Sequence, residues 1–220
     1  MISIEDVSKT YWTRSGPKVI CRNLTCAIAK GTNLGILGVN GAGKSTLMRL
    51  IAGIEEPDSG RIRRRHSVSF PLGFSGTFAG SLTGRENAIF LARVYGAPTE
   101  YVVDFAQDFA DIGDYFDMPV NTYSSGMRSR LAFGVSMAIE FDVYLVDEVT
   151  AVGDQSFQEK CAIALTERFS VSDVIIISHD VSTLERYCNR ASVLHQGTLT
   201  VYDTMADAKA AHLANMKITA

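Results

Sequence analysis

The segment GVNGAGKST, residues 38–46, constrains this chain more than any other, because its spacing lets a backbone wrap around a chain of phosphates. Gly38, four further residues and then Gly43-Lys44-Ser45 form the Walker A pattern. Its glycines allow successive backbone N–H groups to turn inward as a nest for an anion. We expect Lys44 to reach the β- and γ-phosphates of a nucleoside triphosphate and the Ser45 hydroxyl to ligate Mg²⁺. The predicted phosphate-binding residues are Gly38, Val39, Asn40, Gly41, Ala42, Gly43, Lys44, Ser45 and Thr46.

The sequence on both sides of this segment fits a phosphate loop. Leu34–Leu37 is a short apolar run that predicts a buried strand, and Ser45–Ala52 has the Leu, Met and Ile content of a packed helix. The N-terminus of a helix beneath the phosphates adds the positive end of the helix dipole. An ordinary glycine-rich turn is the alternative interpretation.

The rest of the chain shows three kinds of pattern. Short alternating runs in residues 1–28 predict antiparallel strands. Residues 84–140 carry apolar residues three to four positions apart, which indicates a helical insert. Two continuous apolar runs follow, Val143–Val146 and Val174–Ile177, and such runs are typical of parallel strands that are buried on both faces.

Polar residues follow both of these apolar runs, Asp147-Glu148 after the first and Ser178-His179 after the second. Ligands of parallel sheets sit beyond the carboxyl ends of the strands, so we expect Asp147, Glu148 and His179 to lie where Lys44 points. We interpret Asp147 as the acid on the Mg²⁺ side and Glu148 as the base that orients the attacking water. The alternative is a strand that ends at the surface in two solvated acids.

The segment Tyr123–Met127, YSSGM, precedes the first of these runs and resembles the signature sequence of ATP-binding-cassette (ABC) ATPases. In that family the segment opens a helix and meets the γ-phosphate that is bound by the opposite subunit. The N–H groups of Ser and Gly at a helix start do form an anion site. The resemblance covers almost the whole chain, with the motifs in the family's order.

The resemblance assigns further residues. It implies that Asp154 is the D-loop aspartate, that His179 is the switch histidine and that Tyr11 stacks on adenine. Tyr11 as ordinary packing, Trp12 as the stacking ring and His179 as a helix cap are the alternatives. The implied catalytic residues are Lys44, Glu148 and His179, the ATP-binding residues beyond the phosphate loop are Tyr11, Ser124, Ser125, Gly126 and Asp154, and the Mg²⁺ ligands are Ser45 and Asp147.

The resemblance also implies the fold. It is an α/β P-loop NTPase fold, with a RecA-like core, an antiparallel β subdomain and a helical subdomain. We expect a single ABC ATPase domain over residues 1–220, with the helical subdomain of about residues 84–140 inserted in the core.

Two departures from the family pattern stand out. In YSSGM, Ser125 occupies a position usually held by Gly, and Met127 cannot donate an amide hydrogen bond. No Gln occurs between His66 and Phe90, where the family's Q-loop glutamine helps to ligate Mg²⁺ and couples to the membrane domain. Phe74 or Ala79 stands near its usual place.

YSSGM, AVGD at residues 151–154 and FSGTFAGSLTGREN at residues 74–87 are similar to the ATPases that export capsular polysaccharide, O-antigen or teichoic acid. The short stretch after residue 202 favours the capsule exporters. The resemblance implies the ATP-hydrolysing subunit of such an exporter, a homodimer at the cytoplasmic face of the bacterial inner membrane with an integral membrane permease as partner and polysaccharide as transported substrate. An exporter of another glycan, a soluble ABC ATPase that acts on DNA or ribosomes and a regulator without turnover are the alternatives.

Composition bears on these alternatives. The 24 acidic residues exceed the 21 basic ones, and a net charge of −3 disfavours binding through overall charge to nucleic acid, so we expect no nucleic-acid partner. No apolar run approaches the roughly 18 to 20 residues of a membrane span, so we expect a membrane role to come from a partner. The four cysteines lack a CxxC spacing and are expected to stay reduced. The basic run Arg61–His66 predicts a solvated strand or turn, with a site for anionic lipid or polymer as the alternative.

Overall fold

The computed structural model describes residues 2–72, 76, 78–147, 154–178 and 181–219, with only the backbone of 217–219. The contacts between residues divide the chain into two compact units. Unit 1 comprises Met1–Pro71, Asp142–Val149 and Ser172–Ala220, and unit 2 comprises Leu72–Phe141 and Thr150–Val171. The expected helical insert, residues 84–140, falls within unit 2.

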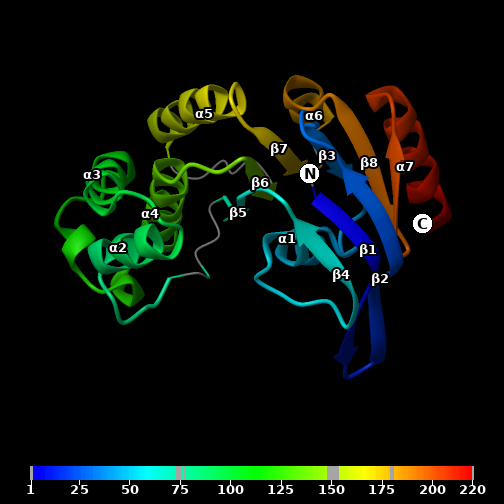
Figure 1. Cartoon of the computed structure of the whole chain (residues 1–220), viewed down its shortest axis with the longest axis horizontal. Helices are drawn as coiled ribbons and strands as arrows, with labels where there is room; N and C mark the ends of the chain where they lie inside the picture. The colour runs from blue at the N-terminus through cyan, green and yellow to red at the C-terminus, as the bar shows by residue number, and fades with distance from the viewer. Residues whose placement is uncertain (1, 73–75, 77, 148–153, 179–180, 220) are drawn as a thin grey trace. The chain divides into compact units, whose positions relative to one another are not determined.

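Unit 1 contains an antiparallel three-stranded sheet in the order β2-β1-β4 (Figure 1). The strands are β1 (Ile2–Thr13), β2 (Gly16–Ile28) and β4 (Ser59–Arg64). β1 and β2 form a hairpin in which Thr13 pairs with Gly16 and Ile2 with Ile28. The antiparallel strands predicted for residues 1–28 are thus confirmed.

The second sheet of unit 1 has six strands in the order β5-β6-β7-β3-β8-β9. The strands are β5 (Val68–Pro71), β6 (Val143–Asp147), β7 (Asp173–Ile177), β3 (Leu34–Leu37), β8 (Arg190–His195) and β9 (Thr198–Tyr202). Every neighbouring pair is parallel except the hairpin β8–β9. All four residues of β3 and four of the five in β7 are buried, which confirms the parallel strands predicted from continuous apolar runs.

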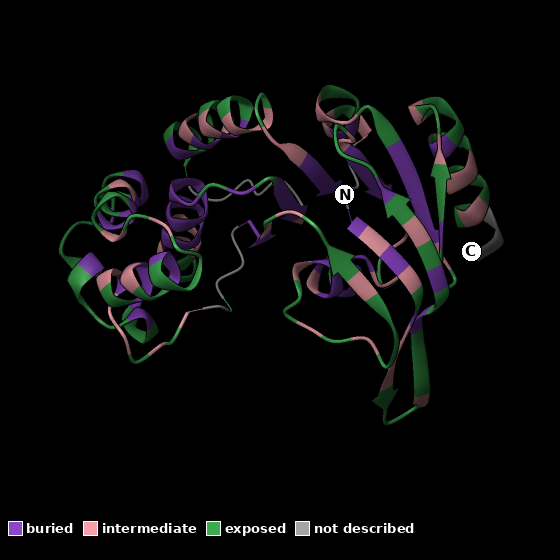
Figure 2. Cartoon of the chain, viewed as in Figure 1, coloured by how far each residue is buried: buried purple, intermediate pink, exposed green. Residues whose placement is uncertain are grey.

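Helix α1, Lys44–Ala52, follows β3 and packs against both sheets of unit 1 (Figure 2). Its side chains Leu47, Met48, Leu50 and Ile51 are each at most 1% exposed and belong to one hydrophobic cluster with residues of both sheets. Truncating such a side chain to Ala costs about 2–5 kcal/mol. The helix that begins at the phosphate loop is therefore held firmly. The other helices of unit 1 are α6 (Val181–Tyr187) and α7 (Met205–Thr219).

Unit 2 is helical. Its elements are α2 (Gly84–Val94), α3 (Thr99–Ala110), the 3₁₀ turns η2 (Gly113–Asp117) and η3 (Val120–Thr122), α4 (Ser125–Ala138) and α5 (Gln155–Phe169). Phe109 of α3 stacks on Phe133 of α4 with ring centroids 5.6 Å apart, and Phe157 of α5 meets Phe109 edge-on at 5.7 Å. Gly134 lets α3 approach α4, because a Cβ there would lie 3.3 Å from the Ala106 carbonyl oxygen.

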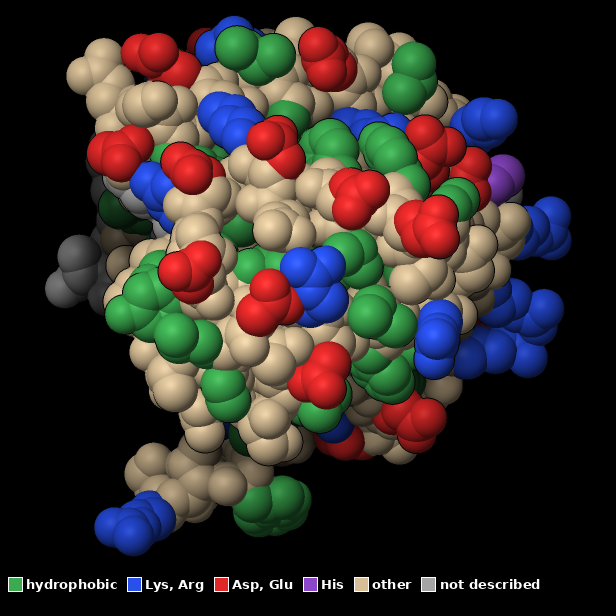
Figure 3. Space-filling model, turned by 90° about the vertical axis from the view of Figure 1, so that its left-hand side faces the viewer, with side chains coloured by type: hydrophobic (Ala, Val, Ile, Leu, Met, Phe, Trp, Pro, Cys, Tyr) green, Lys and Arg blue, Asp and Glu red, His purple; other side chains and the backbone are tan. Residues whose placement is uncertain are grey.

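Within the described ranges, no helix combines the length and the apolar content that crossing a bilayer requires. The face in Figure 3 carries acidic and basic side chains interspersed with scattered hydrophobic ones.

Candidate nucleotide-binding site

The phosphate loop joins β3 to α1 and has a backbone shape that its glycines make possible. Gly41 and Gly43 have φ values of 79° and 102°, in the left-handed region that other residues disfavour. A Cβ on Gly43 would also lie 2.6 Å from Ile20 Cγ2. One on Gly38 would lie 2.7 Å from the Leu194 carbonyl oxygen. Glycine is therefore required for its backbone conformation at positions 41 and 43, and for lack of space at positions 38 and 43.

The N-terminus of α1 is suited to an anion. Gly43 is the N-cap residue and provides no side-chain hydrogen bond, and the first turn contains no acidic residue. The N–H groups of a first helical turn have no partner within the helix, and the helix dipole places partial positive charge there. The residues present thus fit the phosphates of a nucleotide.

Lys44 lies inside this loop and is only 9% exposed. Its Nζ donates hydrogen bonds to the carbonyl oxygens of Gly38, at 2.6 Å, and Val39, at 3.1 Å. The ammonium group is thereby placed against the backbone that is predicted to bind phosphate. Burial and the charge of Lys44 together lower the pKa of His212 on α7.

The other predicted phosphate-binding residues surround Lys44. Asn40 and Gly41 are exposed at the tip of the loop, and Gly38, Val39, Ala42 and Gly43 are half-buried. Ser45, the predicted Mg²⁺ ligand, is exposed. Thr46 is 6% exposed and its Oγ1 accepts a hydrogen bond from Arg49 Nη2 at 3.1 Å.

Asp147 is the last residue of β6 and is half-buried. It pairs in register with Ile177 at the end of β7, and Ile177 pairs with Ile36 of β3. Because the phosphate loop begins directly after Leu37, Asp147 and this loop lie at the same, carboxyl edge of the parallel sheet. This is the placement that the two apolar runs predict.

Two of the predicted catalytic residues, Glu148 and His179, lie outside the described residues, and their positions stay predictions. The described part of the chain contains no group of three or more His, Cys, Asp and Glu that could hold a metal ion. Ser45 and Asp147 stay the predicted protein ligands of Mg²⁺, which commonly takes few protein ligands beside phosphates.

Tyr11, the predicted adenine-stacking residue, is half-buried on β1. Its hydroxyl donates to Glu55 Oε1 at 2.5 Å and accepts from Arg49 Nη2 at 3.2 Å. The alternative ring, Trp12, is 84% exposed. Adjacent side chains of a strand point to opposite faces, and it is Tyr11 that contacts residues of α1 and the segment after it.

The signature-like segment lies in unit 2 at the start of α4. Ser124 is the N-cap residue, and its Oγ accepts a hydrogen bond from the Met127 N–H at 3.2 Å. Ser124 and Ser125 are exposed, Gly126 is half-buried, and the first turn has no acidic residue. Tyr123 anchors the segment because it is buried and its hydroxyl donates to the Tyr115 carbonyl oxygen at 2.6 Å. The segment thus presents an open helix start.

Asp154, the predicted D-loop aspartate, has two partners in unit 2. Its Oδ1 accepts from the Phe157 N–H at 2.9 Å, so it caps the N-terminus of α5. Its Oδ2 accepts from Arg130 Nη2 of α4, also at 2.9 Å. Arg130 lies over the Phe157 ring, with 4.5 Å between the guanidinium carbon and the ring centroid.

Ala79, one of the two positions near the missing glutamine, is hydrogen-bonded to Asn87. Phe74 lies outside the described residues. Ala79 is exposed, and its N–H donates to Asn87 Oδ1 at 2.9 Å while its carbonyl oxygen accepts from Asn87 Nδ2 at 3.1 Å. Asn87 is 1% exposed, and a capping box of Thr83 and Glu86 starts α2 beside it.

The basic run begins on β4, where most residues are exposed, and its last two residues, Arg65 and His66, follow that strand. Arg61 and Arg63 both pair with Glu5 of the neighbouring strand. Arg64 donates to the carbonyl oxygens of Leu50 and Ile51, which satisfies acceptors at the C-terminal end of α1. The predicted solvated strand is confirmed.

Sequence reasoning missed Arg49, Glu55, Asn87 and Arg130. Each acts through partners that are distant in sequence or through backbone atoms, and no spacing pattern identifies such partners. The one available signal is that Asn87 is the last residue of FSGTFAGSLTGREN and that Arg130 follows YSSGM by three positions.

Comparisons with known proteins agree with this geometry. Residues 21–151 match the family model described as ABC transporter. A capsule polysaccharide export ATP-binding protein of Neisseria meningitidis serogroup B is 48% identical over 205 residues, covering 93% of this chain and 95% of that protein. A polysialic acid transport ATP-binding protein of Escherichia coli is 50% identical over 198 residues, covering 89% and 90%.

Among solved structures, a dimeric ATP-binding cassette in a post-hydrolysis state, bound to ADP and Pi, matches with a TM-score of 0.73. The alignment covers 92% of this chain and 98% of that chain at 19% identity, and so shows a shared fold. The family match spans the phosphate loop, the signature-like segment and Asp147, the same features that the geometry brings out. The chain therefore belongs to the ABC transporter family of ATP-binding proteins.

Proposed function

We propose that this chain is the ATP-hydrolysing subunit of an ABC exporter that moves capsular polysaccharide across the bacterial inner membrane. The observation that carries the site chemistry is the glycine-shaped loop that encloses Lys44 at the N-terminus of α1. The assignment of the transported substrate rests on relatives that are named for export of capsule polysaccharide and transport of polysialic acid. These relatives match this chain along about nine-tenths of their length.

In this proposal the phosphate loop binds the triphosphate of ATP through its backbone N–H groups and the Lys44 ammonium group. Ser45 and Asp147 would hold Mg²⁺, which supplies charge neutralisation between the phosphates. Glu148 orients a water and accepts its proton as the water oxygen bonds to the γ-phosphorus. The bond from the γ-phosphorus to the bridging oxygen breaks, and ADP leaves with that oxygen.

The signature-like segment requires a second copy of the chain in the proposal. Ser124, Ser125 and Gly126 are exposed or half-buried at the start of α4, and the first turn has no acidic residue, as an anion site needs. We propose that this segment of one copy faces the ATP bound by the other, with Asp154 beside the junction and His179 at the γ-phosphate. Closing and reopening of the two copies would move an integral membrane permease at the cytoplasmic face of the inner membrane.

The test of export uses cells in which Glu148→Gln replaces the wild-type chain. We expect these cells to synthesise polysaccharide and retain it in the cytoplasm, because the motor lacks its base. A matched Glu140→Gln variant changes an exposed carboxylate that pairs with Arg168, and should export normally. Normal surface polysaccharide in Glu148→Gln cells would contradict the export proposal.

The same cells distinguish capsule from another glycan. Sugar analysis of the retained polymer identifies what is transported, and copurification identifies the permease. Retention of an O-antigen or teichoic acid would support the alternative, an exporter of another glycan. Unchanged glycans together with lost ATPase activity would favour an ABC ATPase outside transport.

A further inference from the structure

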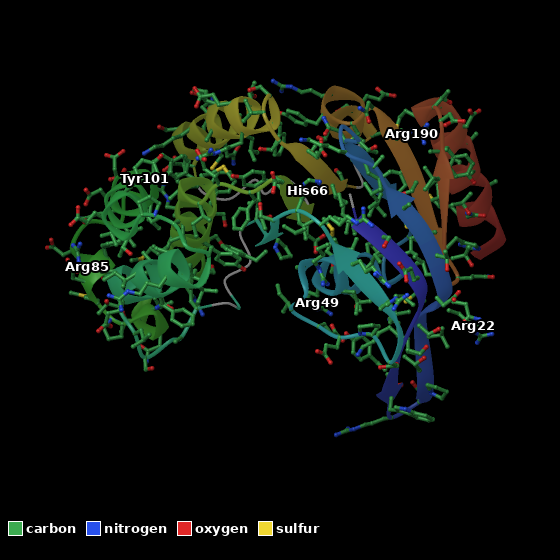
Figure 4. The ribbon with its side chains drawn as sticks, viewed as in Figure 1. Arg22, Arg49, His66, Arg85, Tyr101 and Arg190 are labelled. Atoms are coloured by element: carbon green, nitrogen blue, oxygen red, sulfur yellow. The ribbon has the colours of Figure 1, made fainter. Side chains whose placement is uncertain are left out.

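A polar cluster joins β1 to α1 and to the segment between α1 and β4, all within unit 1. Its members are Lys9, Tyr11, Arg49, Glu55 and Asp58. None of them belongs to the phosphate loop, but one of them, Tyr11, is the residue predicted to stack on adenine. Figure 4 labels Arg49 in this part of unit 1.

Glu55 is the centre of this cluster. Its carboxylate accepts from the Tyr11 hydroxyl and, at 3.2 Å, from Arg49 Nε, and Lys9 Nζ lies 3.2 Å away. Burial alone would raise the pKa of Glu55, but hydrogen bonds from Tyr11, Arg49 and Lys9 outweigh burial and hold this pKa below its ordinary value. The carboxylate is therefore ionised and fully engaged at neutral pH.

Arg49 bridges the ring and the phosphate loop. Its Nη2 donates both to the Tyr11 hydroxyl, at 3.2 Å, and to Thr46 Oγ1, at 3.1 Å. Thr46 is the last residue of GKST and is nearly buried. One guanidinium thus connects the two parts of the site that would hold the two ends of ATP, and its rigid fork of donors suits this bridge better than an ammonium group.

The cluster restrains the Tyr11 ring through its hydroxyl and leaves one of its two faces open. A tyrosine hydroxyl lies in the plane of its ring, so two partners at that oxygen restrain the ring's position and leave the face away from Lys9 for stacking. Lys9 Nζ lies 5.7 Å from the ring centroid, within the range of a cation–π contact. Lys9 is itself held by Asp58 at 3.2 Å and by the Glu56 carbonyl oxygen at 2.8 Å.

We propose that Arg49 and Glu55 are positioning residues for the nucleotide, which hold Tyr11 at a fixed place relative to Thr46 so that one preorganised frame receives both base and phosphates. The inference rests on the proposed stacking of adenine on Tyr11. If Tyr11 and Thr46 are already fixed relative to one another, less conformational entropy is lost when ATP binds. Loss of this arrangement should therefore weaken ATP affinity and leave the rate of the chemical step unchanged. The affinity of a ligand that lacks the adenine base should not depend on the position of Tyr11.

The experiment compares ATP with inorganic tripolyphosphate in binding assays on the purified chain. In Arg49→Met, Arg49→Lys and Tyr11→Phe, the Kd for ATP should rise roughly three- to tenfold, the effect of losing a hydrogen bond. The Kd for tripolyphosphate should change less than twofold. Arg61→Met is the matched control, because it removes an arginine from an exposed pair with Glu5, and both affinities should match the wild type.

A double variant and the truncation Tyr11→Ala distinguish the positioning role of Arg49 and Glu55 from its premise, the stacking of adenine on Tyr11. Tyr11→Phe with Arg49→Met should cost no more ATP affinity than the larger single effect, because both variants remove the same Arg49–Tyr11 hydrogen bond. Equal losses for ATP and tripolyphosphate in Arg49→Met would overturn the positioning role. The positioning role would also be overturned if Tyr11→Phe and Arg49→Met bind ATP as the wild type does. Weak ATP binding in Tyr11→Ala would then still support the stacking of adenine on Tyr11. Wild-type ATP affinity in Tyr11→Ala would overturn stacking and the proposal together.

Discussion

Arg130 donates to the carboxylate of Asp154 at 2.9 Å, and so joins the helix that opens at the signature-like segment to the residue that caps α5. The Arg130 side chain is 18% exposed and packs over Phe157, whereas the Asp154 side chain is 66% exposed. An ion pair with one partner this exposed contributes little to stability by itself. Its consequence is geometric, because it holds the start of α5 against a side chain of α4.

The two roles of Asp154 are separable by substitution. Asp154→Ala removes both the cap and the ion pair, and we expect the free energy of unfolding to fall by about 0.5–2 kcal/mol. Asp154→Asn keeps an oxygen for the Phe157 N–H and should be closer to the wild type in stability. Urea unfolding of both variants measures this difference. Equal stability of Asp154→Ala and the wild type would show that the cap does not matter.

Replacing Lys44 tests the phosphate loop. Lys44→Ala removes the charge that the loop encloses, and we expect ATP turnover to fall by roughly 100-fold or more, as when one donor to developing charge is lost. Phosphate release from ATP is the measurement, with Lys160→Ala of α5 as the control for loss of a lysine. An undiminished rate in Lys44→Ala would refute the assignment.

Restoring glutamine tests the departure in the Q-loop region. The Ala79 side chain is exposed and its backbone is fixed by Asn87, so Ala79→Gln should fold normally. If the chain lacks a ligand there, the variant should need less Mg²⁺ for half-maximal ATPase activity or respond differently to the permease. An identical Mg²⁺ titration and identical stimulation would mean that another group, such as water, already fills this role.

The cysteines provide a prediction for alkaline pH. Burial raises the pKa of Cys21 and Cys26 to about 11 and that of Cys161 and Cys188 to about 12. An unfolded thiol has a pKa near 8.5, so the unfolded chain loses these protons first, and stability should fall as pH rises above roughly 8.5. Urea midpoints at pH 7.5 and pH 10 measure this loss. Alkylation of Cys21 and Cys161, which are buried, should be slow at pH 8 in the folded chain and rapid in urea, and rapid alkylation of these two in the folded chain would contradict their burial.

His212 provides a prediction for the stability of the folded chain at acidic pH. Its pKa is lowered by burial and by Lys44, so the folded chain disfavours the protonated form. The unfolded chain takes up a proton more readily near pH 6.5, and stability should therefore decline as pH falls through that value. His212→Gln should flatten this decline in thermal melts between pH 8 and pH 5.5. The same decline in the variant would assign it to other groups.

Local pattern was sufficient to predict most elements of the fold. The phosphate loop, the strand Leu34–Leu37 and the helix from residue 45 follow from glycine spacing and apolar runs, and the structure begins that helix one residue earlier. The helices of the insert follow from periodicity. Glu148 and His179 stay predictions, because they lie outside the described residues.

Contacts between distant residues were not predictable in this way. Arg49 and Tyr11 are 38 positions apart, and Arg130 and Asp154 are 24 apart. Their meeting depends on how strands and helices pack, which no short pattern encodes. The polar cluster at Glu55 likewise requires the register of β1 and β4, which places Ser8 opposite Ser59 and so brings the preceding segment beside Tyr11.

The most direct measurement of the central claim is size-exclusion chromatography of the purified Glu148→Gln chain with and without ATP, together with its hydrolysis rate. Gln keeps the shape of Glu but cannot accept the proton, so hydrolysis should fall by about 10²- to 10⁴-fold while ATP still binds. We predict a dimer that forms only with ATP and persists, because the two copies cannot hydrolyse the nucleotide that holds them together. A monomer in ATP with continuing hydrolysis would contradict the roles of Glu148 and of the paired sites.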